Sequence, residues 1–360
     1  MFPEWTWILG IFIGAAIGSF LNVCIYRLPR GLSLSKPPNS FCPNCKHKLG
    51  IPDLVPLFSW LFLRARCRYC KEPIASRYFI VELMNGAIWG GLWWQYLVVE
   101  SNPAKGIAYA LFGSALLVAF VTDLEHYVIP DEINAFLLVF GVGYHAMFGN
   151  VMDAVFGALV GWGLLWGVAF LGRVAFGKDA MGHGDIKMAR GLGAMLGPVL
   201  VIAAFFIAVP SGLIGSIVHM SLRPKQATAT GAGVGTGLPV ISGDLPKSEP
   251  PEEEDYEPES VGSLLKCGLG YLLLVDVIAL FAPKVGVSWF GEEEMAEDEI
   301  DDWTPQGTAI PFGPYLALGA VASALFAIPL TKLINDYFNP AGGQPAAVEH
   351  RVSTGGHRVG

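Results

Sequence analysis

Two aspartates lie at the edges of long apolar segments. Asp123 follows the run Gly106–Thr122, and Asp185 directly precedes the run Ile186–Met220. Ionisable residues at membrane depth are functional candidates by default. When two carboxylates lie close together, one keeps its proton, while the ionised one can deprotonate a water molecule that attacks a peptide carbonyl. We therefore interpret Asp123 and Asp185 as a catalytic pair that titrates as a unit, with no fixed role for either.

Glycines loosen the backbone in front of Asp185. Gly182 and Gly184 flank His183 in the stretch MGHGD, although each glycine lowers the stability of a helix. We expect these two glycines to leave room for an extended substrate backbone. His183 is interpreted either as a proton carrier or as a bystander in a loop.

Four cysteines form two Cys-x-x-Cys pairs that are 21 residues apart in the chain: Cys42, Cys45, Cys67 and Cys70. Such doubled pairs have the reach to surround one tetrahedral Zn²⁺ with four thiolates. A site closed by four protein ligands predicts a structural zinc, which would serve as the core of a loop that has few apolar residues. The alternative is four reduced thiols or a redox pair.

Simpler structural roles remain open for several residues near these motifs. Asp123 alone could be a solvated helix end. Asp131, in the stretch IPDEI, is interpreted as the N-cap of a helix that begins near Ile133. Cys24 and Cys267 stand alone in apolar surroundings and are interpreted as packing residues.

The elements that must position these residues are predicted to be membrane helices. The chain is 53% hydrophobic and 15% charged, whereas soluble domains carry about 25% charged residues. We expect an all-α polytopic membrane protein with about eight transmembrane helices and a small zinc-binding loop domain. The candidate spans are Trp5–Tyr26, Phe79–Val98, Gly106–Thr122, Ile133–Phe148, Asp153–Gly172, one or two within Ile186–Met220, and Gly313–Leu330. Because Ile186–Met220 exceeds one crossing and contains Pro198, we favour two crossings there.

The expected organisation follows from these segments. It comprises a first helix (1–26), a zinc loop with the four paired cysteines (27–78), a catalytic core (79–222), an acidic insertion (223–310), a last helix (311–332) and a disordered tail (333–360). Within the insertion, the runs Asp244–Glu259 and Glu292–Asp302 are rich in acids and predict disorder, while Leu264–Ala282 predicts an extra interfacial or re-entrant helix.

Basic residues predict the orientation. Ten Lys or Arg lie between Arg27 and Arg77, and only one lies in the facing loop Glu100–Lys105. Short basic loops stay in the cytoplasm, so the N-terminus is expected outside and both aspartates at the cytoplasmic face. No basic stripe suggests a nucleic-acid partner.

Several motifs occurring in order carry a family resemblance: GSFLNVCIYRLPRG, the two cysteine pairs, SRYFIVELMNG, TDLEHYVIPD, GHGD and IPFGPYLALGA. Over roughly residues 10–220 and 309–330, the chain resembles the type IV prepilin leader peptidases, which are Gly-x-Gly-Asp intramembrane aspartyl proteases. The resemblance implies that Asp123 and Asp185 are catalytic.

The same resemblance implies a location and a set of substrates. The location is the bacterial inner membrane, and the substrates are prepilins and pseudopilins of type IV pili and type II secretion, whose basic leader is cut at the cytoplasmic face. It also implies methylation of the new N-terminus by S-adenosylmethionine, although no residue can be assigned to that cofactor. The insertion of about 90 residues departs from the family pattern.

Two other functions compete with a peptidase. A transporter could use Asp123 and Asp185 to relay protons or bind a cation. A noncatalytic scaffold could use the zinc loop to dock a secretion partner.

Overall fold

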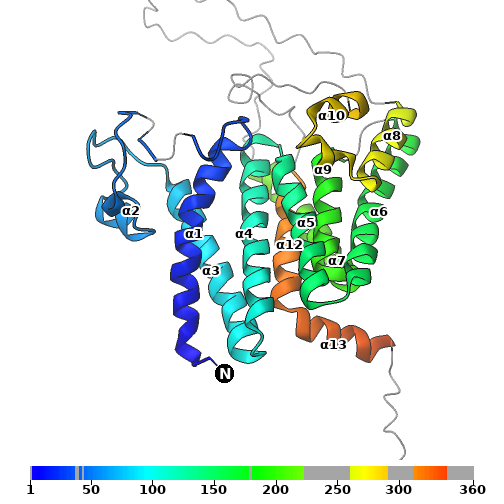
Figure 1. The fold of residues 1–360 in the computed structure, drawn as a ribbon, viewed down its shortest axis with the longest axis horizontal. Helices are drawn as coiled ribbons and strands as arrows, with labels where there is room; N and C mark the ends of the chain where they lie inside the picture. The colour runs from blue at the N-terminus through cyan, green and yellow to red at the C-terminus, as the bar shows by residue number, and fades with distance from the viewer. Residues whose placement is uncertain are drawn as a thin grey trace, which may run out of the picture.

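The computed structural model describes residues 2–36, 40–42, 44–177, 181–222, 260–290 and 311–338, and these are almost entirely helical (Figure 1). Extended pairing within them is limited to two isolated β-bridges in the cysteine loop. The acidic runs Asp244–Glu259 and Glu292–Asp302 and the tail after residue 338 lie outside the described residues.

Seven long helices form the bundle: α1 (Trp7–Arg27), α3 (Ser76–Leu92), α4 (Pro103–His126), α5 (Asp131–Phe148), α6 (Val151–Phe176), α7 (His183–Leu222) and α12 (Gly313–Leu325). A π-helical stretch, Trp93–Val99, continues α3, and a short 3-10 turn, Glu4–Thr6, leads into α1. Among its described residues, the cysteine loop between α1 and α3 holds a 3-10 turn, Ile51–Asp53, and the short helix α2 (Phe58–Phe62) besides the two β-bridges.

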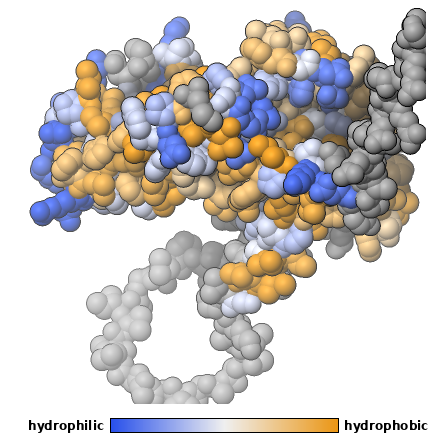
Figure 2. Space-filling view, turned by 90° about the horizontal axis from the view of Figure 1, so that it is seen from below, coloured by the Kyte–Doolittle hydropathy of each residue, from blue (hydrophilic) through white to orange (hydrophobic). Residues whose placement is uncertain are grey.

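By length and composition, four described helices could cross a membrane: Glu4–Arg27, Pro103–His126, Val151–Phe176 and His183–Val218. A fifth is obtained if the bent pair of α12 and the helix after it is counted as one span. Large apolar side chains point outward from the bundle, for example Phe206 (76% exposed) and Leu171 (66% exposed). Apolar surface of this kind fits a lipid environment. Seen from below, the surface mixes hydrophobic and hydrophilic residues (Figure 2).

Helix α7 reverses direction at Gly197, whose φ of 75° and ψ of 173° are not helical. Only glycine adopts this conformation readily, and Pro198 favours extended backbone before it. A Cβ added to Gly161 of α6 would lie 2.1 Å from the Ala189 carbonyl oxygen and 3.5 Å from Val201 Cγ2. In a straight helix, Ala189 and Val201 would be about 18 Å apart along the axis, too far for both to lie beside one glycine. The predicted break near Pro198 is confirmed, and α7 is a hairpin of two antiparallel segments.

The prediction of one last helix over Gly313–Leu330 is wrong at its C-terminal end. Helix α12 stops at Leu325, and α13 (Ala327–Phe338) turns away from it by 82°. A straight continuation would carry the charged residues Lys332 and Asp336 onward within the span. The bend instead places them beside Glu100 and Lys105, around a hollow of about 520 Å³. Residues 333–338 are therefore helical rather than part of the expected tail, and the rest of that tail lies outside the described residues.

The described part of the insertion also differs from the predicted single helix over 264–282. It contains three short helices, α8 (Val261–Leu272), α9 (Val275–Ala279) and α10 (Pro283–Phe290). Leu274 takes a left-handed backbone conformation with φ 59°, which separates α8 from α9. The three helices sit above α6 and α7, at the end of the bundle where α4 ends (Figure 1).

Close approach of small residues joins α6 to the first half of α7. A Cβ added to Gly193 would lie 1.9 Å from the Gly157 carbonyl oxygen, and one added to Gly157 would lie 2.0 Å from that of Gly193. Small residues at such crossings let two backbones touch, which is how membrane helices gain packing energy. Because neither backbone can yield without moving its helix, glycine is required at both positions.

We expect Gly193→Ala to lower the free energy of unfolding by about 1–3 kcal/mol, the usual cost of overpacking. Thermal unfolding of the purified chain in detergent measures this. Gly167→Ala in α6 is the matched control, because a Cβ there meets nothing within 4 Å. An equal melting temperature for the two variants would contradict the close packing of α6 and α7.

Candidate active site and metal centre

Asp123 and Asp185 come together at one end of the bundle. Asp123 lies in the last turn of α4 and Asp185 in the first turn of α7, and they are 6% and 9% exposed. They are near enough for the charge of Asp123 to act on Asp185. Asp123 is thus buried rather than a solvated helix end. Because burial disfavours two adjacent negative charges, the arrangement suits a pair that shares one proton.

The N-terminus of α12 completes this site, and sequence reasoning missed it. The backbone N–H of Gly313 lies near the Asp123 carboxylate. A Cβ added to Gly313 would lie only 2.6 Å from Asp123 Oδ2. The positive end of a helix stabilises a carboxylate, so α12 supplies both a donor and a favourable dipole. The stretch PFGP was the available signal, since it puts a glycine at the start of an apolar helix.

Ile129 closes the site from the connection between α4 and α5. It is 7% exposed and was not identified from the sequence. A Cβ added to Gly184 would lie 3.3 Å from Ile129 Cβ, and one added to Gly313 would lie 3.0 Å from Ile129 Cδ1. Gly184 therefore permits close packing on Ile129. Gly182 is exposed, and a Cβ there would lie 3.4 Å from Asp185 Oδ2.

Each aspartate keeps one buried oxygen, Asp123 Oδ2 and Asp185 Oδ1, with no hydrogen-bond partner among the described residues. Buried polar atoms are almost always paired, and exceptions are typical of functional sites. Two buried carboxylates with spare acceptor capacity can hold and deprotonate a water molecule or receive a substrate group.

Asp131 does not cap a helix, so that prediction is wrong. Helix α5 begins at Asp131 itself, its N-cap is Pro130, and no side-chain hydrogen bond caps it. The carboxylate instead accepts hydrogen bonds from Lys187 Nζ at 2.9 and 3.0 Å. The Asp131 carboxylate therefore binds Lys187 of α7 instead of capping its own helix.

The cysteine loop brings its four thiols together. The sulfurs of Cys42, Cys45, Cys67 and Cys70 all lie within 4.8 Å of one another, and Cys42 Sγ is 3.9 Å from Cys70 Sγ. Four sulfurs at about 2.3 Å from a tetrahedral zinc would be separated by about 3.8 Å. The donor set therefore fits one metal ion. Cys24 and Cys267 are both buried in the helical part, as predicted for packing residues.

The two cysteine pairs share one backbone pattern. The N–H of Cys42 bonds to the His47 carbonyl, and that of Cys67 bonds to the Glu72 carbonyl. The Cys70 backbone N–H donates to the Cys67 sulfur and, with further hydrogen bonds, lowers the pKa of Cys67 to about 7. A thiol that ionises near neutral pH is suited to metal binding.

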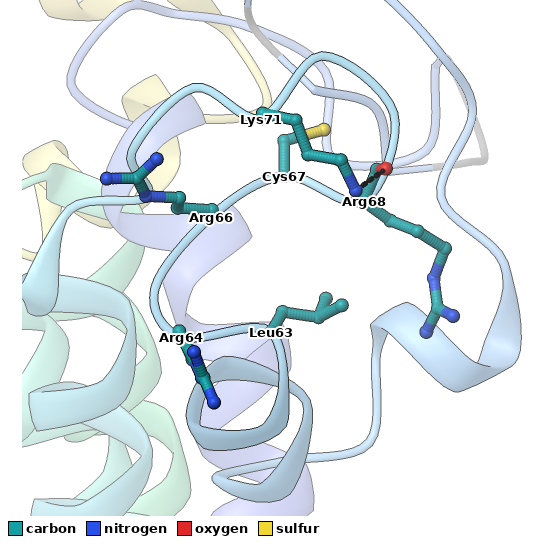
Figure 3. Close-up of a pocket in the computed structure, with 6 residues that line it drawn as sticks. All are labelled: Leu63, Arg64, Arg66, Cys67, Arg68 and Lys71. Carbon is teal, nitrogen blue, oxygen red and sulfur yellow. Dashed lines mark hydrogen bonds between the residues drawn. The ribbon is translucent and has the colours of Figure 1, made fainter.

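Basic side chains surround this module. A hollow of about 430 Å³ is bordered by Cys67 and lined by Leu63, Arg64, Arg66, Arg68 and Lys71. The three arginines extend outward in different directions, while Lys71 Nζ donates to the Arg68 carbonyl at 2.9 Å (Figure 3). Asp53 anchors one of them, with Oδ1 2.6 Å from Arg68 Nε.

Comparison with known proteins places these features in a family. The model described as "Bacterial Peptidase A24 N-terminal domain" matches residues 12–96, which include the four cysteines. The model described as "Type IV leader peptidase family" matches residues 110–217, which include both aspartates.

Two curated relatives illustrate the similarity, and both are called prepilin leader peptidase/N-methyltransferase. The protein of Pectobacterium carotovorum subsp. carotovorum is 34% identical over 267 residues, covering 67% of this chain and 92% of the relative. That of Myxococcus xanthus is 33% identical over 340 residues, covering 89% of this chain and 90% of the relative. No solved structure matches. The paired aspartates, the cysteine cluster and these matches together show that this chain belongs to the type IV leader peptidase family.

Proposed function

We propose that this chain is a membrane aspartic endopeptidase that removes the basic leader of type IV prepilins and pseudopilins. The observation that carries the proposal is the buried pair Asp123 and Asp185, in which each carboxylate keeps one oxygen that finds no hydrogen-bond partner in the described part of the chain. Relatives named prepilin leader peptidase/N-methyltransferase support the substrate class. We assign the catalytic role to these two aspartates and a backbone-accommodating role to Gly182 and Gly184.

In the proposed reaction, the ionised aspartate takes a proton from water as the water oxygen attacks the scissile carbonyl. The protonated aspartate donates to the oxygen that gains negative charge. Collapse of the tetrahedral intermediate breaks the C–N bond and delivers a proton to the leaving amine. The start of α12 at Gly313 packs against the Asp123 carboxylate and holds it in place.

We further propose eight crossings with the N-terminus outside, in the bacterial inner membrane. The reversal of α7 at Gly197 supports counting its two halves separately. With α1, α3, α4, α5, α6 and α12, they make eight. The ten basic residues of the cysteine loop then lie with both aspartates in the cytoplasm. A prepilin would be cut just outside its own membrane helix.

We propose that the cysteine cluster holds one structural Zn²⁺, which supplies a fold to the loop and no catalytic step. The sulfur spacing and closed donor set support this assignment. We also propose methylation of the new N-terminus by S-adenosylmethionine, which the printed names of the relatives support. In this scheme residues 27–78 are the metal module and 79–222 are the catalytic core.

Asp123→Asn and Asp185→Asn should each reduce leader cleavage by about 10³-fold or more, because neither variant can form the acid–base pair. The measurement is co-expression with a prepilin, followed by gel shift and mass spectrometry of the product. Asp153→Asn, at the start of α6, is the control and should cleave normally. If Asp123→Asn or Asp185→Asn cleaved the prepilin at the wild-type rate, this mechanism would be excluded.

Gly313→Ala should lower kcat by about 10- to 100-fold with an unchanged melting temperature, since the added methyl displaces the Asp123 carboxylate. Steady-state cleavage of purified prepilin measures the effect. Gly163→Ala in α6 serves for comparison, because its Cβ meets nothing within 4 Å. Equal kcat values for the two variants would show that α12 does not position Asp123.

Cys42→Ser should abolish stoichiometric metal in the purified chain, whereas Cys24→Ser should retain it. Elemental analysis of the protein in detergent gives the metal-to-chain ratio. Lowering the pH should also release the metal, because bound thiolates must then take up protons. The proposed metal site would be contradicted if the wild-type chain contained no metal or if Cys42→Ser retained it.

A further inference from the structure

The inserted helices α8–α10 dock on one face of the catalytic helix α7. His183, Lys187 and Arg190 lie within about 60° of one another around that helix, at 100° per residue, while Asp185 points to the opposite side. Helix α8 contacts all three side chains through Tyr271, α9 contacts Arg190, and α10 contacts Lys187. The insertion therefore supports the turn that carries Asp185 from behind.

The deepest contact is a buried ion pair. Arg190 and Asp276 of α9 are 3% and 5% exposed, and Arg190 Nη1 is 3.2 Å from Asp276 Oδ1. The second guanidinium nitrogen also bonds to the carboxylate, and Nη1 donates to the Tyr271 carbonyl as well. A buried, bidentate pair of guanidinium and carboxylate groups has a strongly preferred geometry. It fixes where α8 and α9 sit along α7.

A second contact reaches the motif itself. The Tyr271 hydroxyl lies 2.8 Å from His183 Nδ1, two residues before Asp185. Tyr271 is 2% exposed and stacks on Phe290 of α10 with ring centroids 5.4 Å apart. Lys187 Nζ lies 5.4 Å from the centre of the Tyr271 ring while also binding Asp131. Tyr271 is thus a rigid group, held on three sides, that presents its hydroxyl to His183.

We infer that Tyr271 is a positioning residue for the peptidase: through its hydrogen bond to His183, it holds the first turn of α7 so that Asp185 faces Asp123. The inserted segment thereby contributes to the active site of this chain without touching substrate. His183 is then neither a bystander nor a proton carrier but the link between the insertion and the dyad. This inference rests on the proposed function for its kinetic test and on geometry alone for a second test.

The kinetic test compares Tyr271→Phe with wild type in the full chain, using purified prepilin. The substitution removes one hydroxyl and keeps the ring, so we expect kcat to fall about 5- to 10-fold with KM within about twofold. His183→Gln should have a similar effect. The kcat of the double variant should be no lower than that of the less active single variant, because both substitutions alter the same hydrogen bond. Tyr144→Phe in α5 is the matched control. Additive losses, or a kcat equal to that of wild type, would overturn the inference.

The second test needs no cleavage. In the full chain carrying Asp123→Cys and Asp185→Cys, a short bifunctional thiol reagent joins positions 123 and 185, and mass spectrometry follows the rate. Adding Tyr271→Phe should slow the cross-link several-fold, whereas adding Tyr144→Phe should not. An unchanged rate would overturn the positioning role. A wild-type chain that fails to cleave prepilin, together with a slowed cross-link, would defeat the proposed function and leave the positioning role intact.

Discussion

Burial of two carboxylates at one end of the bundle is the constraint on which this structure depends. Such a pair is unfavourable in a low-dielectric interior unless donors, dipoles or a shared proton compensate for it. The compensation comes from helix ends: Asp185 occupies the first turn of α7, and the Asp123 carboxylate lies at the start of α12. Helix α4 must therefore end, and helices α7 and α12 must begin, at the same place in the bundle. The other helices pack so that these three meet there.

Close backbone contacts make this convergence possible. Gly157 and Gly193 let α6 and α7 touch, and Gly197 lets α7 turn back alongside itself. Membrane helices lack a hydrophobic driving force for association, so tight packing of small residues takes a larger share of the stabilisation. An added methyl group at these points would separate whole helices, and the effect would reach the aspartates from a distance.

The two modules outside the bundle are held by different physical means. The cysteine loop is organised locally, by repeated backbone turns that gather four sulfurs into a cluster that could bind a metal ion. The inserted helices depend instead on the bundle, because their buried groups find partners on α7: Asp276 pairs with Arg190, and Tyr271 with His183. The first module is held by hydrogen bonds within its own loop, whereas the second is held by its contacts with α7.

The sequence by itself determined the class of protein and singled out the two aspartates and the four cysteines as candidate site residues. Hydropathy, the placement of acids at segment edges and the spacing of Cys-x-x-Cys pairs are local signals that need no knowledge of neighbours. Even the break in α7 was readable, because proline marks it. Only the tertiary structure decided that Gly313 and Ile129 lie beside the two aspartates. It also decided that Asp131 binds Lys187 and that the Tyr271 hydroxyl reaches His183. Each of these joins residues far apart in the chain, and the packing of helices, rather than any local pattern, selects the partner.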